Sequence, residues 1–207
     1  MVPIVVAAVL AFAVGSYVRA FAAAFEPDPP DTRAEARRAY LSRPRPAWPP
    51  YLELATSAAV ALLCWRAGPQ YAFFAVLAVT LSLIDWRTYR LPDAITLPAY
   101  PVLALTLWPD LPRALLGALA LALLYGLLWF ARPAAMGFGD VKLAGLVGMA
   151  AAAAGWQQWV LAALAGQFAA ALYAAWLLAG RKGSGQTQFP LGPFMLAGAF
   201  ATLCLTS

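Results

Sequence analysis

The chain has 207 residues, of which 63% are hydrophobic and only 11% are charged, and its mean hydropathy is +0.73. A soluble domain has about 45–50% apolar and about 25% charged residues. A water-soluble fold cannot bury this much apolar surface, so the composition excludes that class and predicts an all-α, polytopic integral membrane protein. In such a protein the net charge of +5 reports membrane orientation, and we expect no nucleic-acid partner.

The residue types that are missing limit the chemistry. The chain contains no histidine, which is the commonest general base and metal ligand. Its two cysteines, Cys64 and Cys204, stand alone inside apolar runs, as small buried hydrophobic residues do. We therefore expect no metal site, and any catalysis must use carboxylates, hydroxyls, lysine, arginine or backbone groups.

Eight apolar runs follow one another along the chain, so we expect about eight transmembrane helices. They cover residues 3–24, 52–66, 70–86, 95–108, 112–131, 142–155, 157–179 and 190–206. The runs 95–108 and 142–155 are short for a membrane crossing, which predicts tilted or partial spans. Prolines, glycines and charged residues separate the runs, as is typical of loops.

One polar stretch, residues 26–50, divides the chain into three regions. Residues 1–25 are expected to form the first transmembrane helix, 26–50 a cytoplasmic Pro/Arg-rich loop, and 51–207 the membrane-embedded core. Seven prolines in the loop argue against a packed domain, although residues 33–41 could form a short helix. We expect the four carboxylates of the loop to be solvated: Glu26, Asp28, Asp31 and Glu35.

Basic residues predict the orientation in the membrane. Eleven of the fourteen Lys and Arg residues lie in alternate loops, within residues 33–45, 87–90, 132–142 and 181–182. Arg66 and Arg113 lie in the other loops, and Arg19 is near the inner end of the first run. Positively charged loops face the cytoplasm, so both termini are expected on the non-cytoplasmic side.

Four carboxylates remain at the expected cytoplasmic boundary of the membrane, namely Glu53, Asp85, Asp93 and Asp140. Ionisable residues at membrane depth are costly and are functional candidates by default. Glu53 is expected to hold helices together or to pair with an arginine. Asp110 lies on the opposite side in the sequence WPDLP, where a turn or cap role is expected.

Asp85 ends the apolar run FFAVLAVTLSLID, and Asp140 begins a helix in MGFGDVKLAGL. The predicted topology puts both at the same membrane face. Two close carboxylates can share a proton and activate a water for aspartyl proteolysis. Gly137 and Gly139 would let a substrate backbone approach Asp140. From the residues alone, a helix N-cap at Asp140 and an ion or proton pathway remain open.

Several motifs resemble the type IV prepilin peptidase family. The segment GFGDVKL at 137–143 reproduces its G-x-G-D signature, which presenilin-like proteases share. The segment IDWRTYRLPDAITLP at 84–98 resembles the one that carries its first catalytic aspartate. FPLGPFMLAG at 189–198, GSYV at 15–18 and YLEL at 51–54 resemble three further family segments, in family order.

The resemblance implies that Asp85 and Asp140 are the catalytic aspartates. It also implies supporting or substrate-binding roles for Gly137, Phe138, Gly139, Lys142, Asp93, Pro92, Pro190, Gly192 and Pro193. Asp93 could be an acid that orients the loop after Asp85 or a helix cap after Pro92, and we favour the cap with a supporting role. Lys142 would either satisfy a carboxylate or extend to lipid phosphates.

The family resemblance further implies an aspartic endopeptidase of the bacterial inner membrane whose active site faces the cytoplasm. Its partners would be membrane lipid and the substrates, which are prepilin or pseudopilin subunits of type IV pilus and type II secretion systems. Longer family members carry a loop with two Cys-x-x-Cys pairs expected to bind zinc, whereas residues 26–50 contain no cysteine. The peptidase therefore needs no cofactor and no zinc, and S-adenosylmethionine would be required only if methyl transfer persists.

Two alternatives to the prepilin peptidase stay open. One is a presenilin-like or general signal-peptide peptidase that shares the G-x-G-D signature. The other is a proton-coupled transporter that uses Asp85 and Asp140 as a relay. Transporters often have interrupted helices in matching positions of two halves. The sequence contains no such pairing, which disfavours the transporter.

Overall fold

The computed structural model describes residues 2–133, 136–180 and 189–205, and this part of the chain contains helices and no strand. The N-terminal helices are α1 (Val2–Ala22), α2 (Thr32–Tyr40) and α3 (Tyr51–Arg66). The others are α4 (Ala72–Thr88), α5 (Asp93–Thr106), α6 (Leu111–Ala131), α7 (Phe138–Ala154), α8 (Trp156–Ala179) and α9 (Gly192–Cys204). Short 3₁₀ turns, η1 (Pro69–Tyr71) and η2 (Trp108–Asp110), precede α4 and α6.

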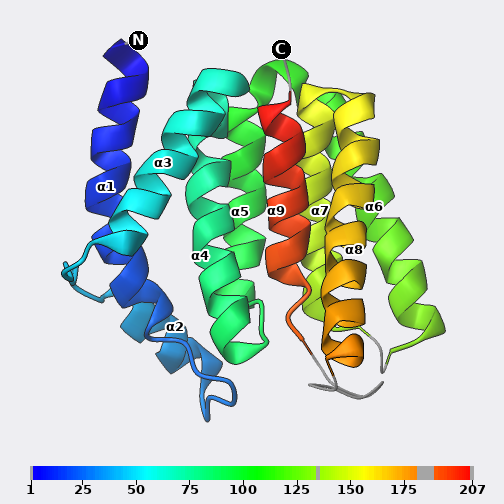
Figure 1. Ribbon diagram of the computed structural model, residues 1–207, viewed down its shortest axis with the longest axis horizontal. Helices are drawn as coiled ribbons and strands as arrows, with labels where there is room; N and C mark the ends of the chain where they lie inside the picture. The colour runs from blue at the N-terminus through cyan, green and yellow to red at the C-terminus, as the bar shows by residue number, and fades with distance from the viewer. Residues whose placement is uncertain (1, 134–135, 181–188, 206–207) are drawn as a thin grey trace.

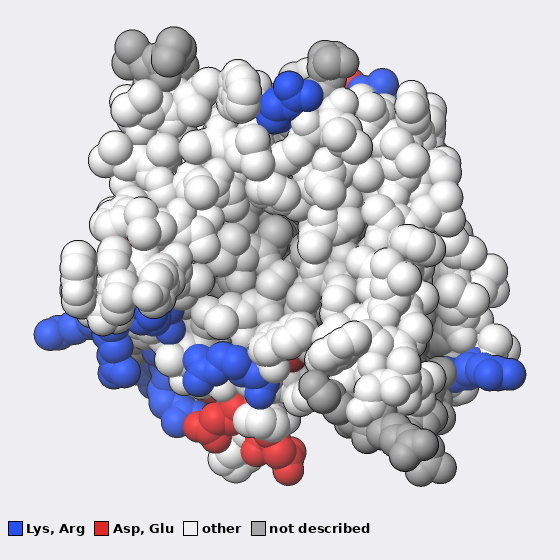
Figure 2. Space-filling view, viewed as in Figure 1, with Lys and Arg blue, Asp and Glu red and all other residues white. Residues whose placement is uncertain are grey.

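Each of the eight apolar runs contains a helix, and the optional short helix in the polar stretch is α2. The all-α prediction is therefore confirmed. The eight long helices alternate in direction along one axis of the molecule (Figure 1). As a result α1 begins and α9 ends at the same end, opposite α2 (Figure 1). Lys and Arg side chains gather at the α2 end, and few lie at the other (Figure 2).

Large apolar side chains on the outside mark the molecule as a membrane protein. Four described helical stretches are long and apolar enough to cross a bilayer: Ile4–Ala22, Pro69–Thr88, Trp108–Ala131 and Trp156–Ala179. Leu127 and Phe168 are each 67% exposed, on α6 and α8. A soluble protein would bury such residues, whereas lipid solvates them.

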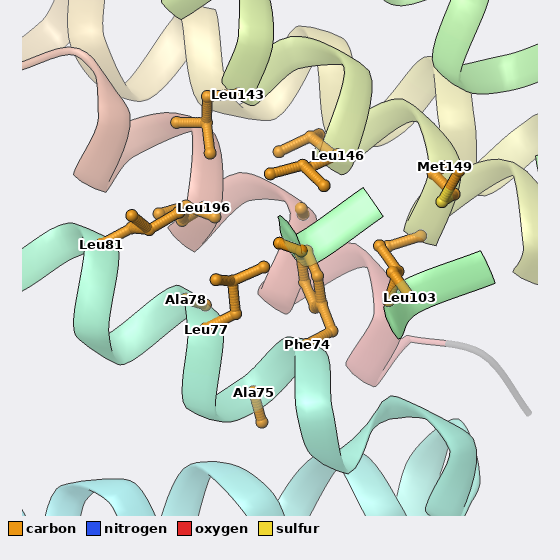
Figure 3. Packing of buried hydrophobic residues seen from close by; sticks show 14 of the residues in the cluster. Phe74, Ala75, Leu77, Ala78, Leu81, Leu103, Leu143, Leu146, Met149 and Leu196 are labelled. Atoms are coloured by element: carbon orange, nitrogen blue, oxygen red, sulfur yellow. The ribbon is translucent and has the colours of Figure 1, made fainter. Parts of the chain in front are cut away.

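Helix α7 is the centre of the bundle. Twelve of its seventeen residues are buried, against three of twenty-four in α8. A helix that is apolar all round has no face to offer to water, so its neighbours enclose it. Figure 3 shows Leu143, Leu146 and Met149 of α7 packed with Phe74 of α4 and Leu196 of α9.

The close approach of α6 and α7 depends on glycine. A Cβ atom on Gly148 would lie 2.4 Å from the carbonyl oxygen of Gly117. Larger residues at either position would separate the helices, and small residues at helix contacts are typical of membrane packing. This contact fixes the height of α7 relative to α6, and therefore the place where α7 begins.

The polar stretch is more ordered than the sequence predicts. Asp31 caps α2 by accepting the backbone N–H groups of Arg33 and Ala34. The prediction that Glu35 is solvated is wrong, because it is 1% exposed. Its carboxylate accepts the N–H of Glu26 at 2.8 Å and pairs with Arg90 at 3.6 Å. Arg90 lies 55 positions further along the chain, so no local pattern could reveal this ion pair.

We expect Glu35→Ala to loosen the polar stretch. The change leaves the Glu26 amide without its buried acceptor and removes the carboxylate that pairs with Arg90, which keeps only the Glu26 carbonyl as an acceptor; the loss costs about 2 kcal/mol. Hydrogen exchange and limited proteolysis of residues 26–50 should report the opening. Arg38→Ala is the matched control, because Arg38 pairs with Glu26 at 3.9 Å on the exposed surface and such pairs contribute about 0–1 kcal/mol. Equal exchange in both variants would contradict the proposed anchoring.

A second ion pair joins α1 to α3. Arg19 donates to the Glu53 carboxylate at 2.5 Å, and Glu53 is 1% exposed. This confirms the prediction that Glu53 pairs with an arginine and holds helices together. Asp110 ends the turn η2 and occupies the N-cap position of α6, where its side chain pairs with Arg113 at 2.6 Å and makes no cap bond. The predicted turn-or-cap position is therefore confirmed.

Candidate active site

A cavity of about 1690 Å³ opens at the α2 end of the bundle. Its wall combines the C-terminal end of α4 and the connection to α5 with the start of α7, one face of α8 and the segment that leads into α9. Among its lining residues are the predicted site residues Asp85, Pro92, Asp93, Gly137, Gly139, Asp140, Lys142 and Pro190. Residues predicted from three separate sequence segments therefore surround one space.

Asp85 lies in the last turn of α4 and is 4% exposed. Helix α4 ends at Thr88, and the left-handed conformation of the next residue, Tyr89 (φ 55°), turns the chain into the segment that lines the cavity. The Asp85 carboxylate accepts the backbone N–H of Gly192 at 3.0 Å. Gly192 is the first residue of α9, so the positive end of that helix faces the carboxylate. The amide and the helix dipole both fix the position of Asp85.

Asp140 lies in the first turn of α7 and is partly buried. Its Oδ2 atom accepts the backbone N–H of Gly137, the residue at the N-cap position, at 3.2 Å. This carboxylate-to-amide bond is half of a capping box, and Gly137 has no side chain to complete the other half. The N-cap alternative is therefore wrong, because Gly137 is at the N-cap and Asp140 is the third residue of the helix. Its side chain still stabilises the start of α7 by accepting the Gly137 N–H.

The fold brings Asp85 and Asp140 to the same cavity from helices that are 55 positions apart in the chain. The two carboxyls interact electrostatically, and each is held by one backbone N–H. A buried pair of this kind cannot easily carry two negative charges, so it tends to share a proton. One member can then accept a proton while the other donates one, which is the requirement for activating a water against an amide.

The prediction that Asp93 caps a helix is wrong, because Pro92 occupies the cap position and Asp93 is the first residue of α5. Its carboxylate instead accepts from the Lys142 Nζ atom. Of the two roles considered for Lys142, the structure supports binding a carboxylate. The pair joins the start of α5 to the beginning of α7, and so ties the segment that follows Asp85 to the one that carries Asp140.

Three predicted residues are not in the cavity lining. Phe138 packs edge-on against Trp129 at a centroid distance of 5.2 Å, and Gly192 lies behind Asp85. Pro193 follows it in the first turn of α9. Lining residues that the sequence did not single out include Gln167, on α8, and the Glu35–Arg90 pair. A glutamine inside an apolar helix was the one available signal for Gln167.

The structure describes no metal centre. Within residues 2–133, 136–180 and 189–205, no group of three or more His, Cys, Asp or Glu side chains could hold an ion. Both cysteines are free, with Cys64 buried in α3 and Cys204 partly buried at the end of α9.

Comparison with known proteins agrees with these features. Residues 72–175, from α4 to most of α8, match the model of the type IV leader peptidase family. A prepilin leader peptidase/N-methyltransferase from Pseudomonas putida is 33% identical over 169 residues, covering 74% of this chain and 58% of that protein. A protein of the same description from Burkholderia pseudomallei strain 1026b is 35% identical over 175 residues, covering 74% of this chain and 53% of that protein.

The chain spans between half and three-fifths of the length of these relatives. No solved structure matches it. The matched region contains both aspartates, the G-x-G-D segment and the Asp93–Lys142 pair. By the match of its sequence over half its length, the chain belongs to the type IV leader peptidase family.

Proposed function

We propose that the protein is an intramembrane aspartic endopeptidase that removes the short basic leader from prepilin or pseudopilin subunits. The observation that carries the proposal is the pair of Asp85 and Asp140 in one cavity, each held by a backbone amide. Family membership and the printed names of the relatives support the choice of substrate.

In the proposed reaction, the ionised aspartate takes a proton from a water while the water oxygen bonds to the scissile carbonyl carbon. The protonated aspartate donates its proton to the carbonyl oxygen, which gives a neutral tetrahedral intermediate. Attack exchanges the protonation states of the two carboxyls. Collapse of the intermediate then breaks the C–N bond: the newly protonated aspartate donates its proton to the departing amine nitrogen, and the ionised one takes a proton from a hydroxyl of the intermediate. The pair thereby returns to its starting state, and no cofactor takes part.

The proposed setting is the bacterial cytoplasmic membrane, crossed by all eight long helices, with both termini on the non-cytoplasmic side. Gathering of basic side chains at the cavity end supports a cytoplasmic active site. An apolar substrate helix could then enter from lipid and present the polar junction behind its leader. Irregular backbone at membrane depth is tolerated where it lines a water-filled cavity, and the segments 89–92 and 189–191 line this one.

The proposal is tested by cleavage of a leader-bearing pilin peptide by the purified protein in liposomes. The family resemblance implies a leader that ends in glycine, so mass spectrometry of the products should show a cut directly after that residue. The same spectrum shows whether a methyl group appears on the new N-terminus when S-adenosylmethionine is supplied. Cleavage of unrelated signal peptides instead would favour a general peptidase, and absence of any cleavage with proton-driven uptake would favour a transporter.

A further inference from the structure

Tyr125 and Gln167 form a part-buried polar pair near the cavity that holds the aspartates, and the reaction above does not use it. The Gln167 amide on α8 donates to the Tyr125 hydroxyl on α6 at 2.8 Å. Tyr125 is 2% exposed, and Gln167 lines the same cavity as Asp140. Polar side chains in the interior of a membrane protein are costly unless they hydrogen-bond. The pair therefore needs a reason beyond packing.

The packing of α6 on α7 places Tyr125 at the height of Asp140. The two helices run antiparallel, with Gly117 against Gly148 at one level. Nearer the cavity, a Cβ atom on Gly126 would lie 3.8 Å from Val141, the residue after Asp140. Tyr125 precedes Gly126 and points inward, as its burial shows. Its phenol also interacts electrostatically with Asp140.

The two groups have complementary unused hydrogen-bonding capacity. The Tyr125 oxygen accepts from Gln167, and within the described residues its own proton meets no acceptor. The Oδ2 atom of Asp140 accepts from Gly137, and across the same described ranges Oδ1 has no donor. A water in a polar cavity can join such groups at little loss relative to a direct bond.

We propose that Tyr125 is a positioning residue for Asp140: oriented by Gln167, its hydroxyl donates through a water to the free carboxylate oxygen. Gln167 orients the hydroxyl because its N–H donates to the phenol oxygen, and the hydroxyl proton must then point away from α8. The nearby cations do not serve as the donor to this carboxylate oxygen. Lys142 is engaged by Asp93, and Arg132 lies on the exposed rim of the cavity. This inference rests on the proposed peptidase function.

The test compares single and double variants in the leader-cleavage assay. Tyr125→Phe should lower kcat about tenfold or more, the loss expected for one hydrogen bond to a charged group, and should leave KM within about twofold. Gln167→Met should lower kcat by a smaller factor. The double variant should match Tyr125→Phe alone, because Gln167 acts only through the tyrosine.

Tyr71→Phe is the matched control. Tyr71 is also 2% exposed and its hydroxyl donates to a carbonyl of α7, that of Ala150, at the far end of that helix. It should change the melting temperature as much as Tyr125→Phe while kcat stays at the wild-type value. Three results would each overturn the inference. The first is a wild-type kcat in Tyr125→Phe, and the second is an equal loss of kcat in Tyr71→Phe. The third is a double variant whose loss of kcat is the product of the two single losses. A wild-type protein that does not cleave would overturn the proposed function instead.

Discussion

Asp85→Asn and Asp140→Asn should each abolish leader cleavage, lowering kcat by about 10² to 10⁴, the contribution of general acid–base catalysis. Asparagine keeps the size of the side chain and its carbonyl can still accept the amide of Gly192 or Gly137. It cannot take up or release a proton at neutral pH, so the pair can no longer cycle. The measurement is the initial rate of cleavage by mass spectrometry, with melting temperature and gel filtration to verify folding.

Asp110→Asn is the matched control for this pair. Asp110 lies beside α6 at the opposite end of the molecule, paired with Arg113, and the substitution there makes the same chemical change. Its activity should equal that of the wild type. If a folded Asp85→Asn or Asp140→Asn protein cuts at the wild-type rate, that residue is not catalytic and the proposed mechanism is wrong.

A pair that works with one shared proton also predicts the shape of the pH profile. Cleavage should rise and then fall with pH, because the doubly protonated pair has no base and the doubly ionised pair has no acid. Initial rates across the pH range in which the protein remains folded would test this. A rate that rises steadily to high pH would show that only one ionised group is needed.

Gly192→Ala should reduce activity about a hundredfold, although it adds only one carbon to a helix. The new Cβ atom would lie 2.7 Å from the Asp85 Oδ2 atom and 3.3 Å from its Cγ atom. These distances are too short, so the carboxylate must move away from the amide that holds it. A displacement of about 1 Å at a reacting group can cost about 10² in rate.

The experiment measures kcat and melting temperature together. Alanine favours helix over glycine by about 1 kcal/mol, so the variant should fold. Gly126→Ala is the control, because its added carbon would meet only Val141, at an ordinary 3.8 Å. Normal cleavage by Gly192→Ala would mean that the contact with Asp85 is unimportant, and loss of activity only in proportion to unfolded protein would mean that it is structural.

The predicted helices were correct because lipid imposes a local rule. A chain that crosses a bilayer must satisfy its backbone within each helix, so apolar runs between Pro, Gly and charged residues mark the helices directly. The predicted run 142–155 began four residues late, since the first turn of α7 (Phe138–Val141) includes Gly139 and Asp140, which line the cavity and interrupt the apolar pattern. Asp140 lies in this turn, where the requirements of the site compete with the apolar pattern.

The sequence by itself determined the membrane class, the positions of the helices and the two candidate aspartates, because each of these depends on residues close together in the chain. Only the tertiary structure decided what surrounds the aspartates. The Gly192 amide reaches Asp85 across 107 positions, and Gln167 reaches Tyr125 across 42. It also decided that Glu35 is buried and that Asp93 binds Lys142. Such contacts depend on which faces of distant helices meet, and helix packing sets those faces through side chains of the whole bundle.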